Sequence, residues 1–217
     1  MASINYFRTG YQQLSAGNPA LSYAVPSTLR TAGSNNDSCP AVNHASVFNM
    51  PRSFDLSVES PASVEQVLSA FGDEDYWRAR LAAFGGGTAT LGSLTVEPDG
   101  TVAVEVRLSL LRDRLPKIVT QLRRGDLEMV RNERWSRIGG GRVCGEVNVA
   151  VPGAPLSVLG EALMAPEPSG SRLQYSTTVE VKVPLVGGKI ESYIGRQVPE
   201  EITALQRFTS EWIAENS

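Results

Sequence analysis

The chain has 217 residues, 41% of them hydrophobic, and its 20 Lys and Arg against 23 Asp and Glu give a formal net charge of −3. These values are typical of one globular domain with a buried core, and they argue against a general nucleic-acid binder, which needs a strongly basic surface. One histidine and two cysteines argue against metal sites built from these residues. We therefore expect no metal, no tightly bound cofactor and no nucleic-acid partner.

Residues 1–49 differ in composition from the rest of the chain. They are rich in Ser, Asn, Ala and Gly, hold only three charged residues, and show no sustained helical or strand period. Such a segment buries too little apolar surface to offset its ordering entropy, so we expect a disordered tail without a function of its own. Alternatively, translation begins at Met50 and the tail is an upstream extension. The segment lacks the apolar stretch of a secretory signal, which favours a cytoplasmic location.

The patterned region, residues 50–217, opens with alternating apolar residues over 52–60, typical of a strand with one buried face. Ser60 and Pro61 then resemble the N-cap and first position of an amphipathic helix that ends at Gly72. Residues 73–87 predict a second short helix with acidic residues in its first turn. Six strand patterns follow, joined mostly by short Gly- or Pro-containing turns, so the sheet should be antiparallel. They cover residues 88–97, 101–110, 126–138, 142–151, 155–165 and 172–183.

Between the second and third of these six strands, residues 112–125 predict a short basic helix. It has two interpretations. It is either a surface helix that covers a sheet edge with its charges solvated, or a lid at a cavity mouth that makes weak contact with an anionic membrane surface. The basic residues are Arg112, Arg114, Lys117, Arg123 and Arg124.

The C-terminal segment carries an apolar stripe at helical spacing. The stripe continues through Gly195 and Pro199, so the pattern predicts one long helix with a kink rather than two separate helices. Its members are Ile190, Ile194, Val198, Ile202, Leu205, Phe208, Thr209, Trp212 and Ile213. A kink at this point would let the helix wrap over a curved sheet.

The order strand, helix, helix, six strands and helix resembles the START-like helix-grip superfamily (SRPBCC), which includes polyketide cyclases and START lipid carriers. The resemblance covers Arg52 to about Ala214. Two stretches carry it: "SVESPASVEQVLSAFGDEDYW", and "VPLVGGKIE" with the long helix that follows it. The second stretch looks like an uncharacterised bacterial branch of the superfamily. It implies an α+β fold in which a curved seven-stranded antiparallel sheet wraps around the kinked C-terminal helix, with a hydrophobic cavity between them. It implies no single chemistry, because the superfamily hosts carriers, cyclases and chaperone modules.

Charged residues interrupt two of the apolar faces. Arg131 and Glu133 share a strand face with bulky apolar residues, so they should point inward, where they must pair or meet a polar ligand. Three interpretations remain open for these two residues. They form an internal salt bridge with each other or with Glu191, they bind the polar part of a ligand, or this strand face is exposed. Glu191 lies on the apolar face of the last helix, either as a first-turn acid favoured by the helix dipole or as a carboxylate at the cavity wall. The candidate ligand contacts are Glu191, Arg131, Glu133, Trp135, Met129, Tyr175, Leu108, Val147, Met164, Ile194, Val198 and Leu205.

We therefore expect binding, with transport or sequestration, of a hydrophobic small molecule or lipid between the sheet and the terminal helix. One alternative is a cofactor-free cyclase, dehydratase or hydrolase, which is weaker because no nucleophile–base pair can be assembled. A second is a protein-interaction or co-chaperone module with a filled core, which would lack a cavity beneath the terminal helix.

Overall fold

The computed structural model describes residues 52–85, 88–110 and 127–217. The expected tail and the expected basic helix, with its membrane contact, lie outside the described residues and stay predictions.

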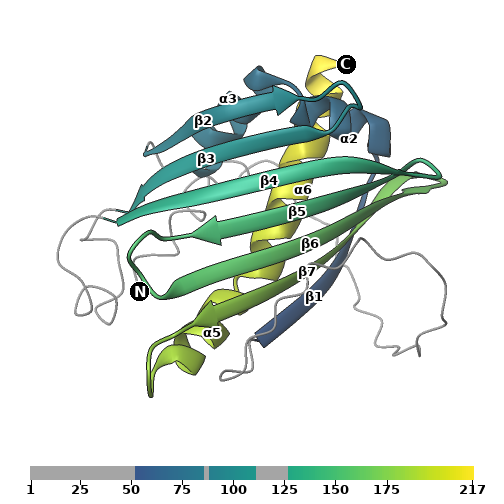
Figure 1. The fold of residues 1–217 in the computed structure, drawn as a ribbon. Coiled ribbons are helices and arrows are strands. Elements are labelled where there is room, and N and C mark those ends of the chain that lie inside the picture. Colours follow the sequence, from purple (N-terminus) through teal and green to yellow (C-terminus); the bar gives the residue numbers. More distant parts are fainter. Residues whose placement is uncertain (1–51, 86–87, 111–126) are drawn as a thin grey trace, which may run out of the picture.

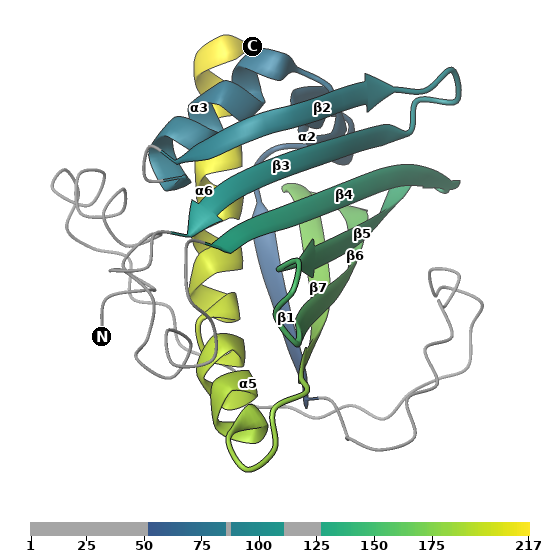
Figure 2. The ribbon, with the colours of Figure 1, turned by 60° about the vertical axis from the view of Figure 1, so that its left-hand side comes forward.

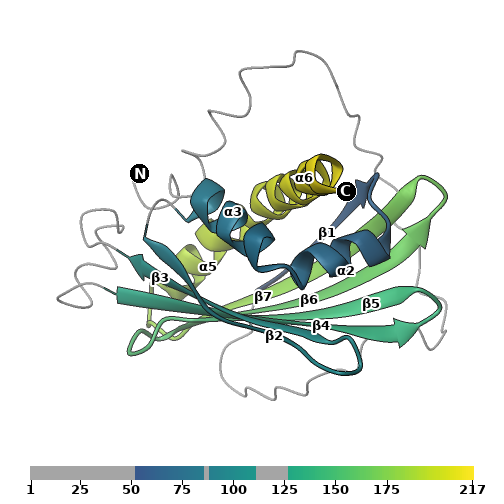
Figure 3. The same cartoon turned by 90° about the horizontal axis from the view of Figure 1, so that it is seen from above.

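The centre of the molecule is one antiparallel sheet of seven strands (Figure 1), as the sequence predicted. Its spatial order is β1-β7-β6-β5-β4-β3-β2, so the first strand pairs with the last and the other neighbours follow the chain. The strands are β1 (Arg52–Ser60), β2 (Ala89–Val96), β3 (Val102–Leu110), β4 (Leu127–Gly139), β5 (Arg142–Ala150), β6 (Leu156–Glu167) and β7 (Gly170–Val181). The sheet is strongly curved, and the helices of the described residues lie on one face of it (Figure 3).

Two short helices, α2 (Val64–Phe71) and α3 (Glu74–Phe84), follow β1 as expected. The N-cap of α2 is Ser63 rather than Ser60. The hydroxyl of Ser63 accepts from Gln66 N, and the side chain of Gln66 accepts from Ser63 N, which forms a capping box. The hydroxyl of Ser60 instead accepts from Ala62 N and bonds the hydroxyl of Ser210, 2.8 Å away, so it ties the end of β1 to the last helix.

The kink in the C-terminal helix is confirmed. It divides the helix into α5 (Gly187–Gly195) and α6 (Val198–Asn216), which run one after the other along the open side of the sheet (Figure 2). The two linking residues, Arg196 and Gln197, keep right-handed helical dihedrals, so the chain bends without unwinding. Gly195 has a further role beside tolerating Pro199: a Cβ atom at this position would collide with the ring of Phe54 on β1. The glycine lets the kinked helix approach the sheet edge.

The core lies between the curved sheet and the helices, and one end of it is rich in aromatic rings. Trp77 and Tyr76 on α3 are almost completely buried and pack against Phe71, which also packs against Trp135. The hydroxyl of Thr209 on α6 donates to Leu205 O, so the bond of 2.8 Å between Tyr76 and Thr209 has the tyrosine as its donor. This contact anchors α6 to α3.

Candidate functional site

A network of charged side chains is buried between α3, β4 and α6. Glu133, whose side chain is 1% exposed, lies at its centre. Its Oε1 accepts from Arg80 Nη2 at 3.1 Å and from Arg131 Nε at 2.7 Å, and its Oε2 accepts from Trp135 Nε1 at 3.1 Å. Arg131 Nη1 also contacts Glu201 Oε1 at 3.4 Å. Two guanidinium groups therefore share two carboxylates, and the cluster has no net charge when all four groups are ionised.

The two carboxylates differ in their electrostatics. Burial by itself would raise the pKa of Glu133, but the charges of Arg131 and Arg80 and the bonds from Trp135 and Arg131 outweigh it and hold the pKa below its usual range. Burial raises the pKa of Glu201, and the same two arginines do not offset it. Glu133 is consequently a fixed anion with both oxygens occupied, whereas Glu201 holds a single long contact to Arg131.

The inward face predicted for β4 is confirmed, since Leu127, Glu133 and Trp135 are all buried. Of the alternatives left open for Arg131 and Glu133, an ion pair between them is present. The partners beyond this pair are Arg80 and Glu201, and the sequence prediction missed both. A signal existed for each. Arg80 lies four residues after Tyr76 on the buried face of α3, and a projection at about 100° per residue places Glu201 within the apolar stripe of the terminal helix.

Glu191 lies beyond the first turn of α5, so its interpretation as a first-turn acid is wrong, and its place at a cavity wall stays a prediction. Its side chain is buried, and its Oε1 accepts from Val181 N at 2.9 Å, at the last residue of β7. It therefore satisfies the backbone where the sheet ends and α5 begins. The ionic partners described for Arg131 and Glu133, beyond their own pair, are Glu201 on α6 and Arg80 on α3.

A small pocket lies beside the network, with a volume of about 50 Å³. Its lining combines apolar side chains from five elements (α3, β2, β3, β4 and α6) with the charged end formed by Arg80, Arg131 and Glu133. The lining residues are Trp77, Arg80, Leu81, Phe84, Gly85, Ala89, Val106, Leu108, Met129, Arg131, Glu133 and Leu205. This volume is the space of one or two water molecules.

Five of the predicted ligand contacts line this pocket: Leu108, Met129, Arg131, Glu133 and Leu205. The others lie elsewhere. The hydrophobic core contains Trp135, Val147, Met164, Tyr175 and Val198, and Ile194 is half-buried on α5. The sequence predicted the inward direction of these side chains correctly, but most of them pack on each other.

Two aromatic side chains of the core occupy space made by glycines. A Cβ atom on Gly145 would collide with the ring of Trp135, and one on Gly160 would collide with the hydroxyl of Tyr175. Burial raises the pKa of Tyr175 to about 12, although Arg131 opposes the shift. The phenol is therefore neutral at pH 7, and it is within electrostatic range of the network without being ionised by it.

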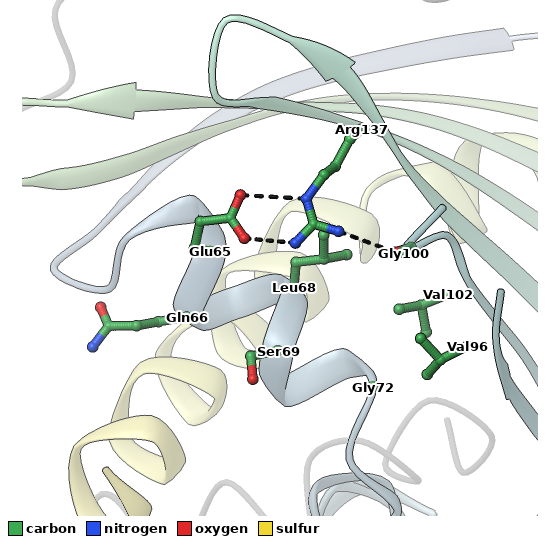
Figure 4. Close-up of a pocket in the computed structure, with 9 residues that line it drawn as sticks. All are labelled: Glu65, Gln66, Leu68, Ser69, Gly72, Val96, Gly100, Val102 and Arg137. Carbon is green, nitrogen blue, oxygen red and sulfur yellow. Dashed lines mark hydrogen bonds and ion pairs between the residues drawn. The ribbon is translucent and has the colours of Figure 1, made fainter. Parts of the chain in front are cut away.

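A second, larger hollow lies on the surface, where α2 meets the hairpin of β2 and β3 (Figure 4). It has a volume of about 570 Å³ and is open to solvent. Its two charged groups are paired with each other, since Arg137 Nη2 lies 2.6 Å from Glu65 Oε2 and Arg137 Nη1 donates to Gly100 O. We assign no ligand to this groove, because its charges are already satisfied within the protein.

In the part of the chain that the structure describes, no group of three or more His, Cys, Asp and Glu side chains is placed to hold a metal ion. In that same part, no helix is both long enough and apolar enough to cross a membrane.

The fold and the buried network define an α+β domain of the helix-grip type, with a single sheet closed by its C-terminal helix. The family described as "Protein of unknown function (DUF2505)" matches residues 55–213, and the chain belongs to this family. Two relatives are 42% identical over 174 residues: the uncharacterized proteins Rv0481c of Mycobacterium tuberculosis and Mb0491c of Mycobacterium bovis. Each alignment covers 77% of this chain and 99% of the relative.

Solved structures of similar shape share little sequence with the chain. TTHA0849 from Thermus thermophilus has a TM-score of 0.48 at 17% identity, with 76% of this chain and 99% of that one covered. A point mutant of Thalictrum flavum norcoclaurine synthase, in complex with a transition-state analogue, has a TM-score of 0.46 at 13% identity, with coverages of 79% and 99%. Ara h 8.0201 has a TM-score of 0.44 at 14% identity, with coverages of 76% and 99%. Likeness at this level carries no information on activity.

Proposed function

We propose that the protein binds a small hydrophobic molecule with a polar, hydrogen-bond-accepting end, in the pocket between α3, the strands β3 and β4, and α6. The observation that supports this is the composition of the pocket wall. Apolar side chains line most of it, and its one charged end presents two arginines against one glutamate. Such a wall suits a molecule that is mostly apolar and carries a carboxylate, sulfonate or carbonyl group at one end.

Arg131 is the group best placed to contact that polar end. Glu133 already accepts three hydrogen bonds, from Arg80, Arg131 and Trp135, so its role is to hold the two guanidinium groups in place. The contact of 3.4 Å between Arg131 and Glu201 is the longest in the network. A ligand carboxylate would replace Glu201 at Arg131. Burial raises the pKa of Glu201 and the pKa of Glu133 is lowered, so the displaced Glu201 takes up a proton more readily than Glu133 does.

The pocket must enlarge to admit such a molecule, because drug-sized ligands occupy about 300–1,000 Å³. Met129 and Leu81 line the pocket and are only partly buried. An unbranched methionine can change rotamer at low cost, so Met129 is the side chain that we expect to move first.

The test is a fluorescence titration with 1-anilinonaphthalene-8-sulfonate, an apolar probe with one anionic group. We expect saturable binding to the full chain and a loss of affinity of at least tenfold in Arg131→Gln. The matched control is Arg134→Gln, three residues along the same strand, where the side chain is about half exposed and pairs with Glu97. Ala89→Leu enlarges a side chain of the pocket wall without changing a residue of the network, and it should also weaken binding.

The small volume favours a second candidate, a protein-interaction module with a filled core. Native mass spectrometry of the purified full chain separates the two. A co-purified small molecule, or probe binding that depends on Arg131 and not on Arg134, supports ligand binding. A chain that carries no small molecule and binds no probe refutes the pocket and leaves the interaction module. An enzymatic role has less support, because both oxygens of Glu133 are occupied and its depressed pKa makes it a weak base.

A further inference from the structure

The connection between β7 and α5 exposes an apolar tip, defined here as residues Val183–Val186. Its central side chain, Leu185, is 100% exposed, which is unusual for a large hydrophobic residue. Pro184 next to it is exposed as well. Views of the molecule from two directions place this connection at one extreme end, beyond the last residue of β7 (Figures 1 and 2).

The backbone at the tip is fixed in an unfavourable conformation. Leu185 has a φ of +68°, and it is the only described non-glycine residue with a positive φ. A leucine rarely adopts this region, whereas glycine or asparagine enters it readily. The turn is closed by bonds of 2.9 Å from Gly187 N to Val183 O and from Val183 N to Val181 O. A Cβ atom on Gly187 would collide with Val181 O, so the turn is also tightly packed. The protein therefore holds a hydrophobic side chain outward in a strained turn, which is a feature of functional surfaces more than of neutral loops.

Basic side chains surround the tip. Lys182, whose side chain is 66% exposed, precedes it, and the exposed Lys189 follows it in the first turn of α5. Tyr193, 42% exposed, lies one turn after Lys189 on the same face. The acid nearest in sequence outside the helix, Glu180, is mostly buried and paired with Lys182 at 3.3 Å. Because Glu180 neutralises Lys182, the net positive charge beside the tip comes from Lys189. The surface that projects from this end is thus a hydrophobic point with a basic rim.

The size of the tip indicates the kind of partner. One leucine, one proline and one tyrosine are too few to supply the roughly 800 Å² per partner of a stable protein interface. A hydrophobic point with a basic rim instead matches the boundary between acyl chains and anionic head groups. We propose that the β7–α5 tip inserts Leu185 into the surface of an anionic phospholipid bilayer, with Lys189 against the phosphates and Tyr193 at the head-group level. This proposal is independent of the ligand pocket and of residues 112–125.

The experiment is co-sedimentation of the full chain with phosphatidylcholine vesicles, with and without about a third phosphatidylserine. The informative variant is Leu185→Asn, because asparagine tolerates the left-handed conformation and removes the apolar side chain without straining the turn. The matched control is Val96→Asn, which changes another exposed hydrophobic residue, on the edge strand β2. Lys189→Glu tests the basic rim.

We expect the parent to sediment with the anionic vesicles only, and less so at high salt. Leu185→Asn and Lys189→Glu should each reduce the bound fraction at least threefold, with an unchanged or higher Tm for Leu185→Asn, while Val96→Asn binds as the parent does. A parent that does not bind anionic vesicles, or a Leu185→Asn variant that binds them fully, overturns the proposal. A third outcome also overturns it. If analytical ultracentrifugation shows that the parent is a dimer and that Leu185→Asn dissociates it, the tip binds a second copy of the chain instead of a membrane.

Discussion

Replacement of Glu133 by glutamine should destabilise the protein more than any other isosteric change in the sheet. The substitution keeps the shape of the side chain but removes the charge that compensates Arg80 and Arg131, whose side chains are only 9% and 15% exposed. Removal of one partner from a buried ion pair costs about 3–5 kcal/mol. The remaining amide oxygen still accepts one or two of the three hydrogen bonds, so we expect about 3 kcal/mol, or a fall in Tm of roughly 6–12 °C for a domain of this size.

Urea denaturation at pH 7 measures this cost. Glu97→Gln is the control, because Glu97 also forms a two-contact pair with an arginine, Arg134, but at the surface, where the loss should stay below about 1 kcal/mol. The pH dependence gives a second readout. The pKa of Glu133 is depressed in the folded state, so its contribution is present above the unfolded pKa of about 4.3 and is lost as the pH falls through the folded value.

The difference in stability between the parent and Glu133→Gln should consequently be full at pH 7 and shrink below about pH 4. A cost at pH 7 no greater than that of Glu97→Gln would refute the buried network. A difference that stays constant from pH 7 to pH 3 would refute the charge as its origin.

Three further substitutions test the same description. Glu201→Gln should cost less than about 1 kcal/mol at pH 7. Because the folded state holds the proton of Glu201 to a higher pH, the parent should lose stability relative to this variant as the pH rises above about 4.3. A free energy of unfolding, measured with urea, that rises for the parent relative to the variant over this range would contradict the assignment. Gly195→Ala should cost about 1–3 kcal/mol through its collision with Phe54. Gly188→Ala should be neutral in thermal denaturation, because the nearest atom to its new Cβ is Arg52 Nη2 at 4.0 Å, an ordinary contact; equal effects would show that no close approach exists at Gly195. Leu205→Ala should cost about 2–5 kcal/mol, and a urea-measured cost below about 1 kcal/mol would mean that α6 does not close the core.

Periodicity in the sequence was enough to predict the sheet, its antiparallel hairpins and the kinked terminal helix. These features follow from local rules. The side-chain pattern repeats every two residues in a strand and about every 3.6 residues in a helix, and proline disrupts the interior of a helix but not its first turn. The same rules placed Arg131 and Glu133 on the inward face of β4, since their strand neighbours on that face are bulky and apolar. Whether residues 1–49 are dispensable, and what the basic segment 112–125 does, stay predictions.

The partners of those two charges were decided only by the tertiary structure. Arg80 lies 53 residues before Glu133, and Glu201 lies 70 residues after Arg131, so no local period links them. Their meeting depends on the curvature of the sheet and on the angle at which α3 and α6 cross it. The close approach of Gly195 to the ring of Phe54 likewise joins two residues that lie far apart in the sequence. The sequence determined which faces are buried, because burial follows from local pattern. The packing of distant elements determined which buried groups touch, and so turned two isolated charges into one network beside a small pocket.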